Sequence, residues 1–320
     1  TGASTADLAV ILVDARQGIL TQTRRHSYLV HLLGICHIVL AVNKMDLVDY
    51  DRAVFDQIVT DYEAFAIEIG IKDFTPMPIS GLAGDNIASK SDATKWYTGT
   101  TLIQHLETVE VDANTAGEKP FRMPVQWVNR PNLDFRGFSG LISSGKIRTG
   151  DNVRIVPSGR NTTIKSIVTQ DGTLSEAVAG QSVTLTFNDE IDCSRGDVVA
   201  LAESPPASAD RFEATLVWMS EHPMVPRRGY WLKIGTQTVS ASVQPPKYQI
   251  GINTLEHLAA KTLDLNAIGV CTFSTDNPIT FEPYAGSKTL GGFVLIDKMS
   301  NSTVAAGMIN FSLRRAHNIH

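Results

Sequence analysis

Two stretches near the start of the chain, residues 6–15 and 37–42, are almost continuously apolar and rich in β-branched side chains. Strands of a parallel sheet have this pattern because both of their faces are covered. Between them, residues 22–33 have the mixed pattern of a helix, with Thr21 as the expected N-cap and Gly34 as the stop. This order predicts a right-handed strand–helix–strand unit with two parallel strands.

A longer amphipathic helix is predicted after the second strand. Its apolar positions recur at helical spacing and are Phe55, Ile58, Val59, Tyr62, Phe65, Ala66 and Ile69. Either Asp49 or Asp51 is expected to cap this helix, and Gly70 to end it. A short strand over 74–79, a polar surface loop over 83–100 and a helix over 101–107 complete the first domain, and 111–120 reads as a linker.

From residue 121 the pattern changes to short alternating strands separated by glycines, as in a β-barrel. Strands are expected over 124–128, 139–147, 151–157, 163–168 and 182–187, and, after a second linker at 203–207, over 212–219, 230–235, 269–273 and 292–297. Trp218 and Trp231 lie in such strands, and barrel packing is favoured over a partner-binding role for both. The chain is therefore predicted to comprise an α/β domain (1–112) and two antiparallel β-barrels (120–204 and 208–320).

Composition narrows the class of protein. A chain of 320 residues with a net charge of −5 fits two or three domains and has no overall basic footprint for nucleic acid, so nucleic-acid binding is not expected, although a local patch stays open. No apolar run has transmembrane length and no signal-peptide pattern is present. Cys36, Cys193 and Cys271 read as buried small residues, which fits a reducing cytoplasm. The eight histidines lack ligand spacing, so no intrinsic metal site is expected.

Asn43, Lys44 and Asp46 directly follow the strand over 37–42, at the end of a strand where α/β sheets bind ligands. A carboxylate at Asp46 can accept hydrogen bonds from guanine N1–H and from the 2-amino group. Adenine has neither donor and would leave the carboxylate unpaired, at a cost of about 1–3 kcal/mol. Asn43 can donate to a purine ring acceptor and tie neighbouring loops together, and the aliphatic stem of Lys44 can cover the base.

A second loop supports the same interpretation. The strand over 74–79 delivers Ser80, Gly81 and Leu82, whose backbone amides can reach the O6 acceptor of a guanine held by Asp46. The alternative is that both segments are ordinary turns, since Asn, Asp and Ser are common turn residues. We favour a guanine-binding site, because the two loops follow successive strands.

The order of a guanine-binding α/β domain and two barrels resembles the translation-factor class of GTPases, typified by elongation factor Tu. Within that class, several stretches resemble the GTPase (large) subunit of bacterial sulfate adenylyltransferase: residues 7–18, 135–140, 192–197, 232–236 and 293–301. The last is the most informative, because elongation factors usually have a shorter turn there.

This resemblance implies an activity and a partner. In that family a small catalytic subunit joins ATP and sulfate into adenosine 5′-phosphosulfate and pyrophosphate, and GTP hydrolysis on the large subunit is coupled to this step of sulfate assimilation and cysteine biosynthesis. It implies a cytoplasmic heterodimer that binds GTP or GDP through Asn43, Lys44 and Asp46, with Ser80, Gly81 and Leu82 completing the pocket. The family often has Ser-Ala-Leu at the last position, so Gly81 is a departure that should keep the backbone contact.

The phosphate-binding part of a P-loop-type GTPase domain is not found in this sequence. A G-x-x-x-x-G-K-[ST] loop, a threonine for Mg²⁺ and a D-x-x-G segment are all needed for hydrolysis and none precedes Asn43. We expect a longer parent chain whose missing N-terminal segment holds the Mg²⁺ ligands, and no catalytic residue can be named. Two alternatives stay open: an elongation or initiation factor that binds aminoacyl-tRNA, and a docking scaffold without a nucleotide site.

Overall fold

A computed structural model describes residues 6–110, 115–132 and 135–313. The chain forms two compact units, one made of Thr1–Asp112 with Gly251–Glu256, the other of Ala113–Ile250 with His257–His320. The second unit holds two separate antiparallel sheet systems, one in each of the expected barrel segments. The exact boundaries at 112/120 and 204/208 stay a prediction.

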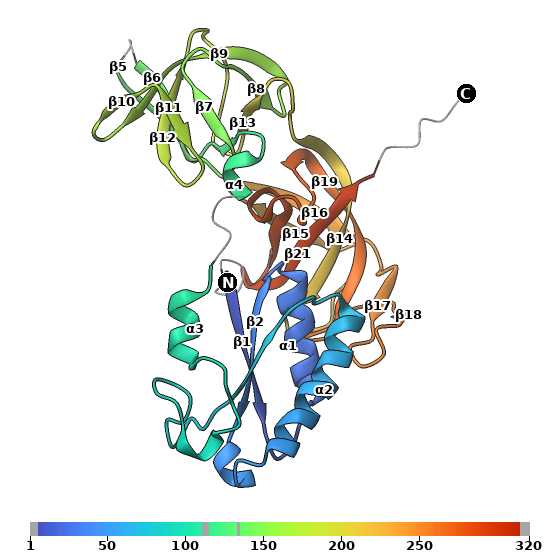
Figure 1. Cartoon of the computed structure of the whole chain (residues 1–320). Coiled ribbons are helices and arrows are strands. Elements are labelled where there is room, and N and C mark those ends of the chain that lie inside the picture. Colours follow the sequence, from blue (N-terminus) through green and yellow to red (C-terminus); the bar gives the residue numbers. More distant parts are fainter. Residues whose placement is uncertain (1–5, 111–114, 133–134, 314–320) are drawn as a thin grey trace. The chain divides into compact units, whose positions relative to one another are not determined.

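The first unit is built on a parallel sheet of order β1-β2-β3 (Figure 1). Its strands and helices are β1 (Leu8–Asp14), α1 (Thr21–Leu32), β2 (His37–Asn43), α2 (Arg52–Ile69), β3 (Thr75–Pro78) and α3 (Leu102–Thr108). Asp14 of β1 is paired in register with Asn43 of β2, and Val42 is paired with Pro78 of β3. All three strands therefore end at one edge of the sheet.

Both faces of β2 are buried, as predicted. On one face, Leu40 and Val42 join a core that includes Phe55, Tyr62 and Phe65 of α2. On the other face, a smaller cluster contains four buried residues, and Leu102 of α3 packs against it. Those four residues are Val39, Ala41, Met77 and Ile79. Figure 1 shows α1 and α2 together on one side of the sheet and α3 on the other.

The prediction that β1 is buried on both faces is wrong. Ile11 and Val13 point into the core, but Val10 and Leu12 on the other face are 38% and 62% exposed. The reason is that, among the described residues, the cluster beneath α3 is centred on β2 and β3, while from β1 only the partly buried Leu8 joins it.

Helix α1 begins one residue earlier than predicted. Leu20 is its N-cap, with an extended backbone and no side-chain capping hydrogen bond, so the assignment of Thr21 as the cap is wrong. Thr21 lies inside the first turn instead, where its hydroxyl cannot serve as an N-cap acceptor. The predicted stop is confirmed, because Gly34 has the positive φ of +64° that glycine adopts without strain.

Helix α2 has the predicted cap and stop. Asp51 accepts a hydrogen bond from the backbone N–H of Ala53 at 2.8 Å, and Gly70 ends the helix with φ +87°. Asp49, the other candidate cap, lies at the end of a short 3₁₀ helix over Met45–Val48. The apolar stripe of α2 faces the core as expected, with only Val59 partly buried.

A small buried polar contact joins α1 to α2. The Tyr62 hydroxyl donates to Ser27 Oγ at 3.0 Å, and Ser27 in turn donates to the Thr23 carbonyl oxygen. His31 of α1 packs against the end of α2. Its imidazole Cε1 would lie 3.4 Å from a Cβ added at Gly70. Burial lowers the pKa of His31 below its ordinary value of 6.5, because the charged imidazolium loses hydration there.

This burial predicts a pH dependence of stability. As pH falls below about 6.5, the unfolded chain takes up a proton at His31 before the folded chain does, so stability is lost as pH falls through the lowered folded-state pKa. His31→Gln should remove this part of the loss. Denaturant midpoints of the two proteins at pH 7.5 and 5.5 measure it, and an equal drop in both would contradict the assignment.

Within its described residues, the first barrel of the second unit contains ten strands and is preceded by a helix of one turn. These elements are α4 (Thr115–Glu118), β4 (Arg122–Pro124), β5 (Trp127–Asn132), β6 (Phe135–Leu141), β7 (Lys146–Arg148), β8 (Asn152–Val156), β9 (Arg160–Thr169), β10 (Gly172–Leu174), β11 (Glu176–Val178), β12 (Ser182–Phe187) and β13 (Val198–Leu201). The main sheet has the order β4-β13-β8-β9-β12-β6-β5. Because β4 and β5 are consecutive in the chain, this segment pairs with β13 through its first half and with β6 through its second, which closes the barrel.

Two predictions for this region are wrong. Helix α4 lies inside the expected linker 111–120, of which 111–114 fall outside the described residues. The predicted single strand over 139–147 is two strands, because β6 ends at Leu141 and Gly145 turns the chain with φ +71° before β7 begins. No side chain fits at Gly145, since an added Cβ would lie 2.5 Å from the backbone nitrogen of Phe121.

The second barrel closes completely. Its elements are β14 (Ala207–Trp218), β15 (Gly229–Ile234), β16 (Gln237–Val243), β17 (Tyr248–Ile250), β18 (His257–Leu258), β19 (Ile268–Phe281), α5 (Lys288–Gly291), β20 (Gly292–Asp297) and β21 (Thr303–Ser312). The order β14-β21-β20-β15-β16-β19 returns to β14 through its pairing with β19. In the interior, Phe212 and Phe273 stack nearly parallel with ring centroids 5.2 Å apart, and Phe293 meets both rings edge-on.

The two tryptophans in question lie on opposite faces of their strands. Trp218 is 2% exposed and packs in the barrel, as predicted. Trp231 is 39% exposed, so the expectation of barrel packing is wrong for this residue. The side chains of β15 alternate between interior and surface, which places Trp231 outside, where the Lys298 ammonium lies 4.1 Å from the ring centroid.

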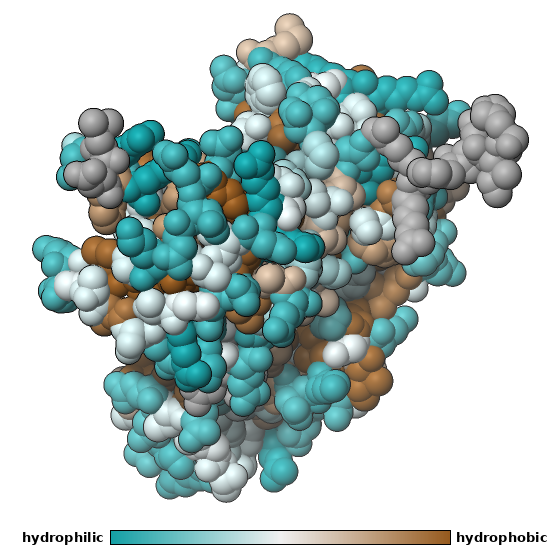
Figure 2. Space-filling model, turned by 90° about the horizontal axis from the view of Figure 1, so that it is seen from above, coloured by the Kyte–Doolittle hydropathy of each residue, from teal (hydrophilic) through white to brown (hydrophobic). Residues whose placement is uncertain are grey.

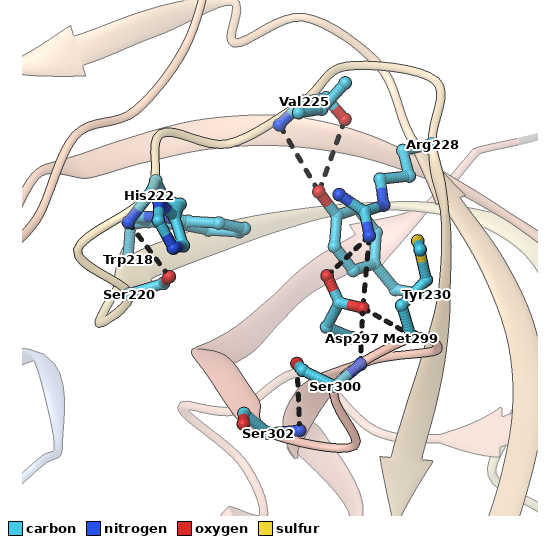
Figure 3. A network of polar contacts seen from close by, with 10 residues as sticks. All are labelled: Trp218, Ser220, His222, Val225, Arg228, Tyr230, Asp297, Met299, Ser300 and Ser302. Carbon is cyan, nitrogen blue, oxygen red and sulfur yellow. Dashed lines mark hydrogen bonds and ion pairs between the residues drawn. The ribbon is translucent and has the colours of Figure 1, made fainter.

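The turn after β20 is held by one carboxylate (Figure 3). Asp297 accepts hydrogen bonds from the backbone N–H groups of Met299 and Ser300 and forms an ion pair with Arg228 at 2.8 Å. The Met299 hydrogen bond is the main cause that lowers the pKa of Asp297, since it stabilises the charged form. Asn301 completes the turn with φ +56°.

Two of the three cysteines are buried as predicted. Burial raises the pKa of both Cys193 and Cys271 to about 12. The prediction is wrong for Cys36, which is exposed because it lies in the short connection between α1 and β2.

Within the described ranges, no helix combines the length and the apolar character needed to cross a membrane. The face drawn in Figure 2 is mainly hydrophilic, with hydrophobic residues in small patches.

Candidate guanine-nucleotide site

The first site loop starts where β2 leaves the sheet. Lys44 adopts the left-handed conformation with φ +65°, and the 3₁₀ helix over Met45–Val48 follows at once. Met45 is completely buried, and its backbone N–H donates to the Ile79 carbonyl oxygen at 3.2 Å. The buried side chain and this bond fix the loop between two strand ends, so its polar side chains project from a rigid base.

Asn43 ties the two predicted loops together. Its Oδ1 accepts hydrogen bonds from the backbone N–H of Lys44 at 2.8 Å and from that of Gly81 at 2.9 Å. This is the bridging role expected from the sequence. A side chain as small as alanine fits at position 81, because an added Cβ would be in ordinary contact with Asn43 Oδ1 at 3.4 Å and the backbone of Gly81 is not left-handed.

Asp46 and Ser80 form the second link between the loops. The buried Ser80 hydroxyl donates to Asp46 Oδ1 at 2.6 Å and accepts from the Ala83 backbone N–H at 3.1 Å. The carboxylate of Asp46 is half-buried and held in a fixed orientation by this bond. Leu82, the last predicted member, is 91% exposed. The structure therefore brings all six predicted residues together on two adjoining loops.

A hydrogen bond from Tyr50 to Asp85 anchors the loop that contains Ser80, Gly81 and Leu82. Tyr50 donates its hydroxyl proton to Asp85, which raises the pKa of Tyr50 to about 12 because the neutral phenol is the donor. Asp85 also pairs with Ser80 through a backbone bridge. The predicted surface loop 83–100 is consequently better anchored than its polar sequence indicates, and Asn86 within it is buried, donating to the Pro78 carbonyl oxygen.

Asp14 and Arg16 belong to the same edge of the sheet and were not predicted from the sequence. Asp14 forms an ion pair with Lys44 at 2.8 Å and with Arg16 at 2.7 Å. The Arg16 hydrogen bond, followed by that of Lys44, holds the pKa of Asp14 well below its ordinary range. The available signal was the parallel register: Asp14 ends the strand beside the one that ends at Asn43.

Family comparisons agree with the order of the domains. Residues 1–124 match the elongation factor Tu GTP binding domain, residues 138–200 match elongation factor Tu domain 2, and residues 211–310 match the GTP-eEF1A C-terminal domain-like family. Two solved structures of Sup35, complexed with GDP and with GMPPNP, share the fold with TM-scores of 0.58 and 0.55. They are 23% identical to this chain and cover 98% of it and 80% of their own chains. The fold and these matches give the chain the domain order of the elongation factor Tu class.

More similar relatives show which family within this class the chain resembles. The bifunctional enzyme NodQ of Rhizobium sp. (strain N33) is 51% identical over the whole chain, which covers 49% of that protein. The bifunctional enzyme CysN/CysC of Xylella fastidiosa is 49% identical over the whole chain, which covers 51% of it. Sulfate adenylyltransferase subunit 1 of Aliarcobacter butzleri is 49% identical over 97% of the chain and 66% of its own length.

The chain therefore belongs to the family of sulfate adenylyltransferase subunit 1. It spans about half the length of the first curated relatives that it matches.

Proposed function

We propose that the full-length protein is the GTP-binding subunit of a two-protein sulfate adenylyltransferase. It couples GTP hydrolysis to the formation of adenosine 5′-phosphosulfate and pyrophosphate from ATP and sulfate. The identity of about half over the whole chain to relatives named sulfate adenylyltransferase subunit 1, CysN/CysC and NodQ supports this branch over an aminoacyl-tRNA carrier. The observation that carries the proposal is the double link between the two loops, Asn43 to Gly81 and Asp46 to Ser80.

In this proposal the two loops bind guanine together. Asp46 accepts from N1–H and from the 2-amino group. The loop over Ser80, Gly81 and Leu82 offers O6 the backbone N–H of Leu82, because those of Ser80 and Gly81 already donate to the Asp85 carbonyl oxygen and to Asn43 Oδ1. The carboxylate is oriented in advance by Ser80, so little ordering remains when the base binds. Adenine would place its 6-amino group against donors and leave Asp46 unpaired, which opposes ATP at this site.

The phosphates and Mg²⁺ are assigned to another part of the protein. In the described ranges no group of three His, Cys, Asp or Glu side chains could hold a metal ion, and the 320 residues contain no phosphate-binding loop pattern. The residues present fit the base of GTP or GDP but not its metal. We therefore place the Mg²⁺ ligands in the part of the full-length protein outside this sequence.

The partner in this proposal is a small catalytic subunit that forms adenosine 5′-phosphosulfate, and the complex works in the cytoplasm. The name "subunit 1" of the relatives supports a heteromeric assembly. The net charge of −5 supports a protein partner over nucleic acid.

Reconstitution tests the proposal. The full-length protein and the small subunit are mixed with ATP and labelled sulfate, and adenosine 5′-phosphosulfate is measured with GTP, with GMPPNP and without a guanine nucleotide. GTP should raise the yield, whereas GMPPNP should not sustain it, because the uphill reaction needs hydrolysis. The small subunit alone is the control. A yield that does not respond to GTP would reject the proposal.

A further inference from the structure

Asp14 reaches the candidate site from a strand that the guanine motif does not include. It is the last residue of β1 and is paired in parallel register with Asn43, the last residue of β2. The next backbone N–H, that of Ala15, donates to the Asn43 carbonyl oxygen at 2.9 Å. The two strand ends are therefore bonded together, and the Asp14 side chain leaves the sheet beside the loop that carries Lys44.

Arg16 fixes the orientation of the Asp14 carboxylate. The Arg16 backbone N–H and Nε each donate to Oδ1 at 3.0 Å, and its terminal nitrogen donates to Oδ2 at 2.7 Å. A two-pronged contact of this kind defines direction as well as distance. Only 18% of the Asp14 side chain is exposed, so the carboxylate has one arrangement relative to the sheet.

Lys44 is held at both ends. Its backbone has the left-handed conformation that non-glycine residues rarely adopt, and its ammonium donates to Asp14 Oδ2 at 2.8 Å. The aliphatic stem must therefore run from the end of β2 toward the end of β1. A free lysine side chain would sample many rotamers, and ordering it on ligand binding would weaken affinity.

The Arg16–Asp14 pair is also electrostatically linked to the guanine-reading residue. The pKa of Arg16 is raised chiefly by its hydrogen bond to Asp14, and the carboxylate of Asp46 adds to the effect. The charged cluster Asp14–Arg16–Lys44 thus lies within the field of Asp46, at the same edge of the sheet.

We propose that Asp14 is a positioning residue for guanine binding: it anchors the Lys44 ammonium so that the aliphatic stem of Lys44 is already in place to cover the base. This inference rests on the proposed guanine site. It assigns Asp14 no contact with the nucleotide, and Arg16 serves to aim the carboxylate. The competing reading is that Asp14 only stabilises the turn that follows β1, through Arg16.

A double-mutant cycle separates the two readings. The variants are Asp14→Asn, Lys44→Met and the double variant in the full-length protein, and the dissociation constants of GDP and inosine diphosphate are measured. The amide oxygen introduced by Asp14→Asn would still accept the two Arg16 hydrogen bonds now made to Oδ1, which hold the turn. The contacts at Oδ2, from Lys44 and from the terminal nitrogen of Arg16, are lost. Asp14→Asn should weaken GDP binding by about 3- to 10-fold, as expected for losing one partly exposed charged contact. In the Lys44→Met background the same change should have no further effect.

The preference for GDP over inosine diphosphate is the second readout. A change that disturbed the structure of the site would alter this preference as well as the affinity. The ratio of GDP to inosine diphosphate affinity should stay at the wild-type value in Asp14→Asn, because Asp46 still reads the 2-amino group. Effects that multiply in the double variant, or wild-type affinity in Asp14→Asn, would overturn the inference. Should Asp14→Asn not fold, Asp14→Glu keeps the charge and should bind GDP within about 2-fold of the wild type; a loss as large as that of Lys44→Met would count against the inference. If the wild type binds GDP and ADP equally well, the proposed site itself fails.

Discussion

Asp46→Asn should weaken GDP binding by about 10²- to 10⁴-fold and give the protein a new affinity for xanthosine diphosphate. The carboxylate accepts two hydrogen bonds from guanine, and an amide can accept only one while its NH₂ group faces the 2-amino group. Losing charge-assisted bonds and opposing two donors costs about 3–5 kcal/mol, and each 1.4 kcal/mol is a factor of ten in affinity. Xanthine has an oxygen in place of the 2-amino group, so it pairs with the same amide.

The surrounding structure should accept this substitution. Asn has nearly the same shape as Asp, and its oxygen can still accept the Ser80 hydroxyl that now bonds to Asp46 Oδ1 at 2.6 Å. The loop is also held by the buried Met45, which the change does not touch. Competition binding with GDP, xanthosine diphosphate and ADP measures the effect. A variant that binds GDP as tightly as the wild type would show that Asp46 does not read the base.

Asn43→Ala should cause the second largest loss. Its Oδ1 accepts the backbone N–H groups of both Lys44 and Gly81, so alanine leaves two donors without this acceptor and separates the loops. We expect GDP binding to weaken by about 10²-fold and the free energy of unfolding to fall by about 1–2 kcal/mol, the size of one or two hydrogen bonds. Isothermal titration and chemical denaturation measure the two quantities.

Gly81→Ala is the matched control for this variant. It changes the other end of the same contact but keeps the backbone N–H, and its new Cβ would lie 3.4 Å from Asn43 Oδ1, an ordinary distance. It should bind GDP like the wild type. If Gly81→Ala lost as much affinity as Asn43→Ala, steric crowding of the loop rather than the Asn43 hydrogen bonds would explain both results.

The sequence predicts the central elements of the first unit well because their signals are local. The apolar run that becomes β2 and the helical stripe of α2 each depend on residues a few positions apart, and the Asp51 cap and Gly70 stop are likewise local. Burial of β1 was predicted wrongly, because exposure of Leu12 depends on which elements cover that face rather than on the strand itself.

In the barrels, the strand predictions also succeeded where the signal was local and failed where it was not. The bounds predicted for the strands at 182–187 and 292–297 agree with β12 and β20. The first alternates polar and apolar residues, and the second is a short apolar run between a glycine and an aspartate. The strand predicted over 139–147 failed where Gly145 turns the chain, although its sequence offers glycine there as a warning. Trp231 was misplaced because its outward orientation depends on the register of β15 with its neighbours.

In the candidate site, residues that follow a strand directly could be predicted, whereas a residue defined by a contact distant in sequence could not. Asn43, Lys44, Asp46, Ser80, Gly81 and Leu82 could be selected because each group follows a recognisable strand, and the structure places them on adjoining loops. Asp14 was missed because its role appears only in the ion pair with Lys44, 30 residues away in the sequence. Guanine binding by these residues stays a prediction that the variants above address.

The nucleotide dependence of the reconstituted complex shows whether this loop selects the nucleotide that drives the coupled reaction. Adenosine 5′-phosphosulfate formation is measured for the wild type and for Asp46→Asn, each with GTP and with xanthosine triphosphate. We expect the wild type to respond to GTP alone and Asp46→Asn to respond to xanthosine triphosphate, because the base specificity of this loop controls the coupled reaction. An Asp46→Asn complex that is still driven by GTP would contradict this expectation.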